Sequence, residues 1–349
     1  MLIARAPMRI SFGGGGTDLE AYYVKYGGIV ISTAIDKYFY AILTTNEADE
    51  LQVISADYRV LFRHSAQNDL TWDGNLALPK AVLHHFGIRR GVNLFTASEV
   101  PPGTGLGSSS AAAVTMVRAI STLIEQPMTK QQVAELASTI EITKMGMPIG
   151  KQDQYAAAFG GFNKITFTCD DVTVEPLNIA SDVRQTLERR LMLFFTGSSR
   201  ESTSILKHQR KSTQDSDEAV LQALHNIKQV ALDVQACLEA GNLDEFARLL
   251  HYSWQEKRRL APGLSNGLID EYYGLALEHG AMAGKITGAG GGGFMLLYCP
   301  EEAQQRVTSV LEEHSLKRMN FRFDSQGATV LLNMAQFNRA WVEPYDHSL

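Results

Sequence analysis

The chain has 349 residues, of which 45% are hydrophobic and 20% are charged, and its formal net charge at pH 7 is −6. Two domains are expected at this length, because a single hydrophobic core rarely grows so large. The negative charge disfavours nucleic-acid and membrane-surface partners, and the apolar runs are too short to span a bilayer. Three distant cysteines (Cys169, Cys237 and Cys299) fit no metal-binding pattern, which favours a reducing compartment and a cytoplasmic protein.

The first part of the chain is predicted to form strands separated by turns. Its β-branched and aromatic residues gather in short runs, which are typical of strands. The predicted strands are Met1–Pro7, Arg9–Phe12, Gly28–Ile35, Tyr38–Thr44, Leu51–Leu61 and Val92–Ser98. A helical pattern over Leu76–Phe86 ends at Gly87, a residue that commonly terminates helices.

The middle and the end of the chain mix helices with strands. Predicted helices cover Ser109–Glu125, Lys130–Met145, Gln152–Phe159, a long region from Thr203 to about Glu278 with breaks near Gly241 and Pro262, and Glu301–His314. Predicted strands cover Phe162–Phe167, Val172–Pro176, Leu191–Thr196, Lys285–Thr287, Phe294–Cys299, Met319–Phe323 and Ala328–Leu332. A polar stretch, Thr186–Arg190, precedes one of these strands. We therefore expect a boundary there, with domains 1–188 and 189–349.

The most informative segment runs from Pro101 to Ala111 and reads Pro-Pro-Gly-Thr-Gly-Leu-Gly-Ser-Ser-Ser-Ala. Alternating glycines let a backbone approach a ligand closely. An apolar run follows at once, so the segment is expected to feed a helix N-terminus, which attracts anions. The alternative is a glycine-rich turn capped by serine. Phosphate binding is the favoured interpretation, because a cap needs only one serine and one glycine.

Two common phosphate-binding motifs are excluded for this segment. The Walker A motif requires a Gly-Lys-Ser/Thr sequence, and no lysine occurs at that place. The dinucleotide motif Gly-x-Gly-x-x-Gly ends on Ser108 or Ser110 here instead of glycine. Serine hydroxyls therefore stand where a lysine would be expected.

Three further segments have an unusual composition. Arg5–Asp18 contains Gly13–Gly16 followed by Thr17 and Asp18, which suits a polyhydroxylated ligand, although Asp18 could equally cap a following helix, Leu19–Lys25. Gly150–Gly161 places Asp153 near a helix start, where an acid often only stabilises the helix dipole. Lys285–Phe294 contains four consecutive glycines, which a plain hairpin does not need, so close approach to a ligand is favoured.

One acidic residue lies where a solvated acid is not expected. Glu141 shares a helical stripe with Ala134 and Ala137, at positions i+7, i and i+3. The helical spacing alone does not indicate a function for Glu141.

Together these segments resemble the GHMP small-molecule kinases, a family that includes galactokinase, homoserine kinase and mevalonate kinase. The resemblance extends from Arg5 to about Leu332, with three motifs in order. It implies an α+β fold of two domains: an N-terminal α/β domain like ribosomal protein S5 domain 2, and a C-terminal ferredoxin-like domain, with the active site between them. The segments Arg9–Asp18 and Gly150–Tyr155 look most like those of family members that phosphorylate the anomeric hydroxyl of D-glycero-D-manno-heptose 7-phosphate for surface-polysaccharide precursors.

The resemblance implies ATP and Mg²⁺ as cofactors and a sugar phosphate as the partner. Asp153 matches the family's base and Arg9 its active-site arginine; some relatives lack the aspartate, so Asp153 abstracts a proton or orients the hydroxyl. The metal ligands implied are Glu141 and Ser109, with Ser110 as the alternative to Ser109. The implied ATP-binding residues are Pro102, Gly103, Thr104, Gly105, Leu106, Gly107, Ser108, Ser109 and Ser110.

The implied substrate-binding residues are Gly14, Gly15, Thr17, Asp18, Gly161, Gly288, Gly290 and Gly291, to which we add Arg200. Galactokinases have Gly-Glu-His-Thr-Asp where this chain has Gly14-Gly15-Gly16-Thr17-Asp18, which argues against galactose. Hydroxyls and Arg200 in the segment Thr196–Thr203, ahead of a basic helix, suit the phosphate of the acceptor; the alternative is a solvated basic face.

Two other functions remain open at this point. A free-sugar kinase such as a fucokinase shares similar motifs. A non-catalytic sugar-binding regulator would belong to a different class, but intact Asp153, Arg9, Ser109 and Glu141 argue against it. The sequence is compatible with a homodimer and carries no specific signal for the oligomeric state.

Overall fold

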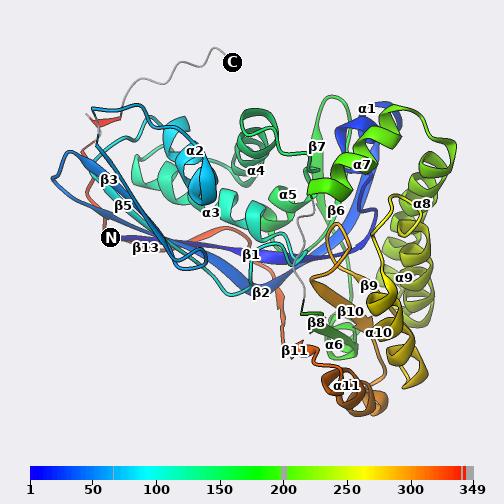
Figure 1. Ribbon diagram of the computed structural model, residues 1–349. Helices are drawn as coiled ribbons and strands as arrows, with labels where there is room; N and C mark the ends of the chain where they lie inside the picture. The colour runs from blue at the N-terminus through cyan, green and yellow to red at the C-terminus, as the bar shows by residue number, and fades with distance from the viewer. Residues whose placement is uncertain (66, 198–202, 339–340, 343–349) are drawn as a thin grey trace.

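Two β-sheets with helices packed around them form the molecule (Figure 1). The computed structural model describes every residue except 66, 198–202, 339–340 and 343–349. In Figure 1 helices α2 to α5 lie over one face of the first sheet, and helices α8 to α10 lie beside the second. This is the mixed α/β fold of two domains that the sequence predicts.

The described strands are β1 (Leu2–Gly13), β2 (Gly28–Thr45), β3 (Glu50–Ser55), β4 (Val60–Ser65), β5 (Val92–Ser98), β6 (Phe162–Phe167), β7 (Val172–Pro176), β8 (Leu191–Phe195), β9 (Ala283–Ile286), β10 (Phe294–Tyr298), β11 (Lys317–Met319), β12 (Phe323–Asp324) and β13 (Thr329–Asn333). The described α-helices are α1 (Glu20–Tyr26), α2 (Ala77–His85), α3 (Ser108–Leu123), α4 (Lys130–Ser138), α5 (Gln152–Phe159), α6 (Ser181–Arg190), α7 (Thr203–Gln214), α8 (Glu218–Ala240), α9 (Leu243–Lys257), α10 (Gly267–Glu278) and α11 (Gln304–Glu313). Short 3₁₀ turns at Gly74–Leu76 and Glu301–Ala303 precede α2 and α11, and a π-helical turn, η2 (Thr139–Lys144), continues α4.

Strands β1 and β2 are the long central strands of the first sheet, whose order is β13-β1-β2-β5-β3-β4. Strands β6 and β12 also pair with β2, and β7 pairs with β6. The β1–β2 register shifts between Pro7 and Met8, where Asp36 and Lys37 bulge out of β2. Proline is tolerated at such a bulge because it has no N–H to donate. For β1 and for β2 alike, the sequence predicts two short strands separated by a break, whereas the structure has one long strand with an irregularity at that place.

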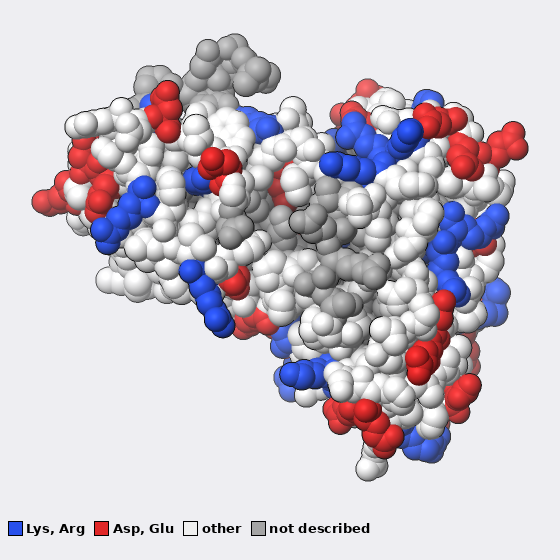
Figure 2. All heavy atoms as spheres, in the orientation of Figure 1, with Lys and Arg blue, Asp and Glu red and all other residues white. Residues whose placement is uncertain are grey.

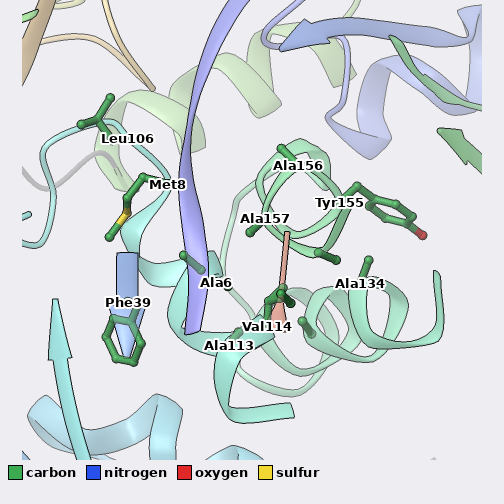
Figure 3. Close-up of a cluster of buried hydrophobic side chains, with 14 of the residues drawn as sticks. Ala6, Met8, Phe39, Leu106, Ala113, Val114, Ala134, Tyr155, Ala156 and Ala157 are labelled. Atoms are coloured by element: carbon green, nitrogen blue, oxygen red, sulfur yellow. The ribbon is translucent and has the colours of Figure 1, made fainter. Parts of the chain in front are cut away.

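The main core lies between this sheet and helix α3. Alternate residues of a strand face the same side, and the buried β1 residues Ala6 and Met8 contact the core in this way. Figure 3 shows Ala113 and Val114 of α3 between β1 and the alanines of α4 and α5. These small side chains let the helices approach closely. Arg9 and Ser11 alternate with this apolar set and lie on the cavity described below.

The second sheet has the order β11-β8-β10-β9, with every neighbouring pair antiparallel. Helix α6 leads into β8 and was not predicted, because Leu187 is its only buried residue and its sequence lacks an apolar stripe. The predicted helical region from Thr203 is divided into α7 to α10. Its breaks near Gly241 and Pro262 are confirmed, whereas the break after Gln214 was missed.

Two predicted strands are divided differently in the structure. Leu51–Leu61 includes β3, a turn and the start of β4, which form a hairpin. The single strand predicted over Met319–Phe323 is wrong: β11 joins the second sheet, and β12 pairs with β2 in the first. The chain thus returns to the first sheet near its C-terminus, and β13 pairs with β1. A division at residue 188 stays a prediction, since strands from beyond it complete the first sheet.

The surface carries both signs of charge. Figure 2 shows Lys and Arg interspersed with Asp and Glu on the face displayed. Among the described residues, no helix has the length and apolar character needed to cross a membrane.

Candidate active site

The glycine-rich loop lies at the N-terminus of α3, as the sequence predicts. Gly107 is the N-cap residue, with a positive φ of 77°, and no side chain caps the helix. The helix has 16 residues, so its N-terminal dipole is fully developed. The N–H groups of its first turn are therefore available to an anion, since helix starts without a cap leave such donors unsatisfied.

Arg9 and Asp153 form a bidentate ion pair beside this loop. Arg9 Nε donates to Asp153 Oδ1 at 2.6 Å, and a terminal nitrogen donates to Oδ2 at 2.7 Å. The other terminal nitrogen donates to the carbonyl oxygen of Gly105 at 2.7 Å. Asp153 is thus fixed by an arginine rather than serving only the dipole of α5. The fork also holds the loop, because a guanidinium presents its donors in a rigid plane.

A second glycine-rich loop, Thr287–Gly293, connects β9 and β10 and packs on the first one. Gly105 has a φ of 84°, and a Cβ atom there would lie 2.5 Å from the carbonyl oxygen of Thr287. A Cβ on Gly288 would lie 2.4 Å from the Cα of Gly105. The amide of Phe294 also donates to the carbonyl of Thr104 at 3.1 Å. Glycine is therefore required in the two loops because their backbones pack directly against each other, whether or not a ligand is bound.

Asp18 is buried at the edge of the same cavity. Its Oδ1 accepts the amide of Gly16 at 2.9 Å, and Oδ2 accepts the amide of Gln152 at 3.2 Å. It does not cap α1, whose N-cap is Leu19. Burial raises the pKa of the Asp18 carboxyl, and the nearby charge of Asp153 adds to that rise. Oδ1 also accepts a hydrogen bond from Gln152 Nε2 at 3.2 Å, so Oδ2 is the oxygen that keeps capacity for a ligand hydroxyl.

Glu141 lies behind the serines of the loop. Ser109 Oγ donates to its Oε1 at 2.7 Å, and Gln154 Nε2 donates to its Oε2 at 2.6 Å. The residue lies in the π-helical turn η2 and is 1% exposed, and burial raises the pKa of its carboxyl. Among the described residues, no basic side chain forms an ion pair with it. A buried carboxylate without a cation beside a hydroxyl fits a hard divalent cation such as Mg²⁺.

The loops, Arg9, Asp153 and Asp18 surround a cavity of about 180 Å³, whereas Glu141 does not line it and lies behind Ser109. Its lining brings together the first loop, the second loop, the Gly15–Asp18 turn and the start of α5. The predicted site residues that line it are Arg9, Gly15, Asp18, Gly103, Gly105, Gly107, Ser108, Ser109, Ser110, Asp153, Gly288 and Gly290.

Other predicted site residues do not line the cavity. Thr104 and Leu106 are buried within the loop, and Pro102 lies exposed at its start. Thr17 Oγ1 lies 2.8 Å from the carbonyl oxygen of Gly14 and holds the turn closed. The amide of Gly291 donates to Leu264, and that of Gly161 donates to Asp324 of β12. Arg200 lies outside the described residues. The functional roles of all these residues stay predictions.

Two lysines on the cavity wall were missed by the sequence analysis. Lys257 ends α9 and Lys285 lies in β9, and both are at least nine-tenths buried. Burial, together with the charge of Arg9, lowers the pKa of Lys257 to about 8. Burial and the nearby charge of Lys257 lower that of Lys285 well below its usual range. Lys257 lies in no local motif. Lys285 is the first residue of the segment Lys285–Phe294, which was singled out for its glycines and not for its lysine.

Comparison with known proteins agrees with this geometry. Residues 76–161 match the GHMP kinases N terminal domain, and residues 234–315 match the GHMP kinases C terminal domain. The first match contains the glycine-rich loop, Glu141 and Asp153. The second contains Lys257 and the second glycine-rich loop.

Similar proteins include enzymes named for heptose and fucose. The D-glycero-alpha-D-manno-heptose 7-phosphate kinase of Campylobacter jejuni is 32% identical over 93% of this chain and 96% of its own length. The L-fucokinase/L-fucose-1-P guanylyltransferase of Bacteroides fragilis is 24% identical over 89% of this chain, which spans 36% of that longer protein. The crystal structure of a D-glycero-D-manno-heptose 1-phosphate kinase from Bacteroides thetaiotaomicron superposes with a TM-score of 0.79 at 27% identity, covering 96% of this chain and 100% of the other.

Proposed function

The chain belongs to the GHMP kinases and is a sugar kinase, and we propose that it transfers the terminal phosphate of ATP to the anomeric hydroxyl of D-glycero-D-manno-heptose 7-phosphate. The product would be the 1,7-bisphosphate, a precursor for nucleotide-activated heptose and surface polysaccharides. The observation that carries the proposal is the Arg9–Asp153 pair, 2.6 Å apart, beside an uncapped helix N-terminus on one cavity. The likeness to the Campylobacter jejuni heptose kinase supports the choice of sugar.

The proposed mechanism relies mainly on positioning. Phosphoryl transfer has little covalent chemistry for the protein to perform, so alignment and charge stabilisation dominate catalysis. The loop Gly103–Ser110 would hold the triphosphate through its amides and hydroxyls. Asp18 would accept hydrogen bonds from sugar hydroxyls and so turn the anomeric oxygen toward Asp153.

Asp153 is proposed to hold the proton of the attacking hydroxyl. Arg9 keeps both carboxylate oxygens oriented through its two hydrogen bonds. The same guanidinium lies beside the loop, so it can stabilise charge on the transferring phosphoryl group.

Ser109 and Glu141 are the residues that would hold Mg²⁺. The metal would supply charge neutralisation for the phosphate oxygens when bound. Ser109 already contacts Glu141, so the oxygen ligands are preorganised. Gln154 fixes the second carboxylate oxygen and so limits the rotation of Glu141.

Replacing Glu141 with glutamine is expected to raise the Mg²⁺ concentration needed for half-maximal activity at least about tenfold, because one anionic ligand is lost. The measurement is initial rate against Mg²⁺ at saturating ATP. Glu135→Gln is the matched control, since Glu135 is an exposed acid of α4 one helix segment earlier. An unchanged magnesium dependence of Glu141→Gln would remove this residue from the proposed metal site.

The substrate assignment has its own test. Purified protein is incubated with Mg-ATP and heptose 7-phosphate, heptose 1-phosphate, free heptose, mannose or fucose, and the phosphate position in each product is determined by ³¹P NMR. We expect the highest kcat/KM with heptose 7-phosphate and an anomeric phosphate in the product. A preference for fucose or free heptose would establish a free-sugar kinase instead. Binding of sugars without turnover would establish a regulator.

A further inference from the structure

Lys257 and Lys285 are buried lysines that form no ion pair among the described residues, and the carboxylates of Asp18 and Asp153 act on Lys257 only from beyond salt-bridge distance. Lys257 is 8% exposed and Lys285 is 3% exposed, and both line the cavity. The Lys257 ammonium donates to the carbonyl oxygen of Gly288, and that of Lys285 donates to the carbonyl oxygen of Ser11 at 2.9 Å. An ammonium group has three donors. Each lysine therefore has N–H groups left that can donate hydrogen bonds to a ligand in the cavity.

The contrast with other buried cations of this chain is informative. Lys80 is 4% exposed and pairs with Asp73 at 2.6 Å, and Arg9 pairs with Asp153. Among the described residues, no ion pair involves Lys257 or Lys285. Burying an unpaired charge is unfavourable, and the charge is retained only when a partner compensates it. The compensating anion is then expected to come from a ligand.

Further unsatisfied polar atoms line the same cavity. Gln209 of α7 is 4% exposed, and its Nε2 has no hydrogen-bond partner. Ser11 Oγ is likewise buried without a partner, on the residue whose carbonyl binds Lys285. Both residues line the cavity. A cluster of unused donors beside two ammonium groups matches an acceptor-rich anion, and phosphate is the anion that this enzyme handles.

We propose that Lys257, Lys285 and Gln209 of the C-terminal half of the chain, together with Ser11 of β1, form a phosphate-binding subsite that completes the active site. This inference rests on the proposed kinase function. The phosphate has two sources in that reaction: the terminal phosphate of the nucleotide or the phosphate ester of the acceptor. Lys257 adjoins the loop that packs on Gly105, and Lys285 adjoins the strand that leads to Asp18. The subsite thus lies where nucleotide and acceptor meet.

The experiment compares Lys257→Met and Lys285→Met with the wild-type protein, because methionine keeps much of the length and removes the charge. Calorimetry gives Kd for Mg²⁺ complexes of ADP and of the β,γ-imido analogue of ATP. Kinetics gives KM for heptose 7-phosphate and for free heptose. If the subsite holds the nucleotide's terminal phosphate, the analogue binds at least tenfold more weakly while ADP binding is unchanged. If it holds the acceptor's phosphate, KM rises at least tenfold for heptose 7-phosphate only.

Two controls separate this subsite from a structural role. Lys80→Met removes an equally buried lysine that already has its carboxylate, so its Tm should fall while ligand binding is retained. The Tm of unliganded Lys257→Met and Lys285→Met should fall less than that of Lys80→Met, because each variant loses a hydrogen bond to a carbonyl but no ion pair. The proposal would be overturned if both Kd values and both KM values of the two variants stayed within twofold of wild type. It would also be overturned if all four constants rose equally and the Tm fell as far as that of Lys80→Met.

The same design keeps the proposed function separately testable. If wild-type protein phosphorylates neither heptose, the proposed substrate is wrong, yet the two nucleotide arms still decide whether the subsite binds the terminal phosphate. Arg200→Ala serves as the competing variant for the acceptor arm. A selective rise in KM for heptose 7-phosphate in Arg200→Ala alone would place the acceptor phosphate there and overturn its assignment to the lysines.

Discussion

Replacing Asp153 with asparagine is expected to lower kcat by about 10² to 10⁴-fold, the range typical of losing a positioned proton acceptor. The asparagine keeps the shape of the side chain and one acceptor oxygen for Arg9, so the cavity should retain its form. Because the loop amides and Ser109 are untouched, Kd for Mg-ATP should change little. Stopped-flow or steady-state rates at saturating substrates measure the first quantity, and calorimetry measures the second.

The variant also loses half of a buried ion pair. Arg9 is nearly inaccessible, whereas the Asp153 side chain is 22% exposed, so we expect a cost of about 2 kcal/mol in the free energy of unfolding. Asp182→Asn is the matched control, since Asp182 is an exposed acid in the first turn of α6. If Asp153→Asn behaved like this control, with near-normal turnover, Asp153 would only stabilise its helix dipole.

Replacing Gly105 with alanine is expected to disrupt the contact between the two glycine-rich loops. A positive φ costs a non-glycine residue about 1–2 kcal/mol, and the added Cβ would lie 2.5 Å from a backbone oxygen that cannot rotate away. Overpacking typically costs a further 1–3 kcal/mol. Since the Gly105 carbonyl also binds Arg9, the ion pair with Asp153 should shift, and Kd for Mg-ATP should rise at least tenfold.

Gly74→Ala separates these two contributions. Gly74 has a φ of 65°, and a Cβ there would have no atom within 4 Å. Its cost should therefore be about 1 kcal/mol, with unchanged nucleotide binding. Chemical denaturation and calorimetry of both variants provide the comparison. Equal losses of stability, with ATP binding preserved in Gly105→Ala, would contradict a packed contact between the loops.

Local patterns predicted those elements whose signals are local. A helix from Ser109 was predicted directly after the glycine-rich loop, and α3 begins one residue earlier, at Ser108. The stripe of Ala134, Ala137 and Glu141 also follows from sequence spacing, and all three residues are buried. Helix α6 was missed because burying only Leu187 leaves no apolar period to detect. Met319–Phe323 was predicted as one strand, since nothing local indicates that β11 and β12 join different sheets.

Single residues of the site were likewise predictable only where the sequence near them carries a signal. The pairing of Arg9 with Asp153, 144 positions apart, was anticipated only through family resemblance. Lys257 was not predicted as a site residue, because a lysine at the C-terminal end of a helix is normally exposed to solvent and stabilises the helix dipole. Its burial arises from the second glycine-rich loop folding over it, which is a tertiary contact. The same holds for Gln209, an ordinary helical glutamine until α7 is placed against the Gly16 turn.

The return of β13 to the first sheet has a consequence for biosynthesis. Residues Leu2–Arg5 leave the ribosome long before their partners on one side, Thr329–Asn333. N-terminal segments generally begin to fold during synthesis, so the nascent first sheet must wait with one row of backbone donors and acceptors unpaired. An open edge of this kind is where chains associate with one another. The slowest and most aggregation-sensitive interval of folding should therefore end only when the final strand is translated and closes that edge.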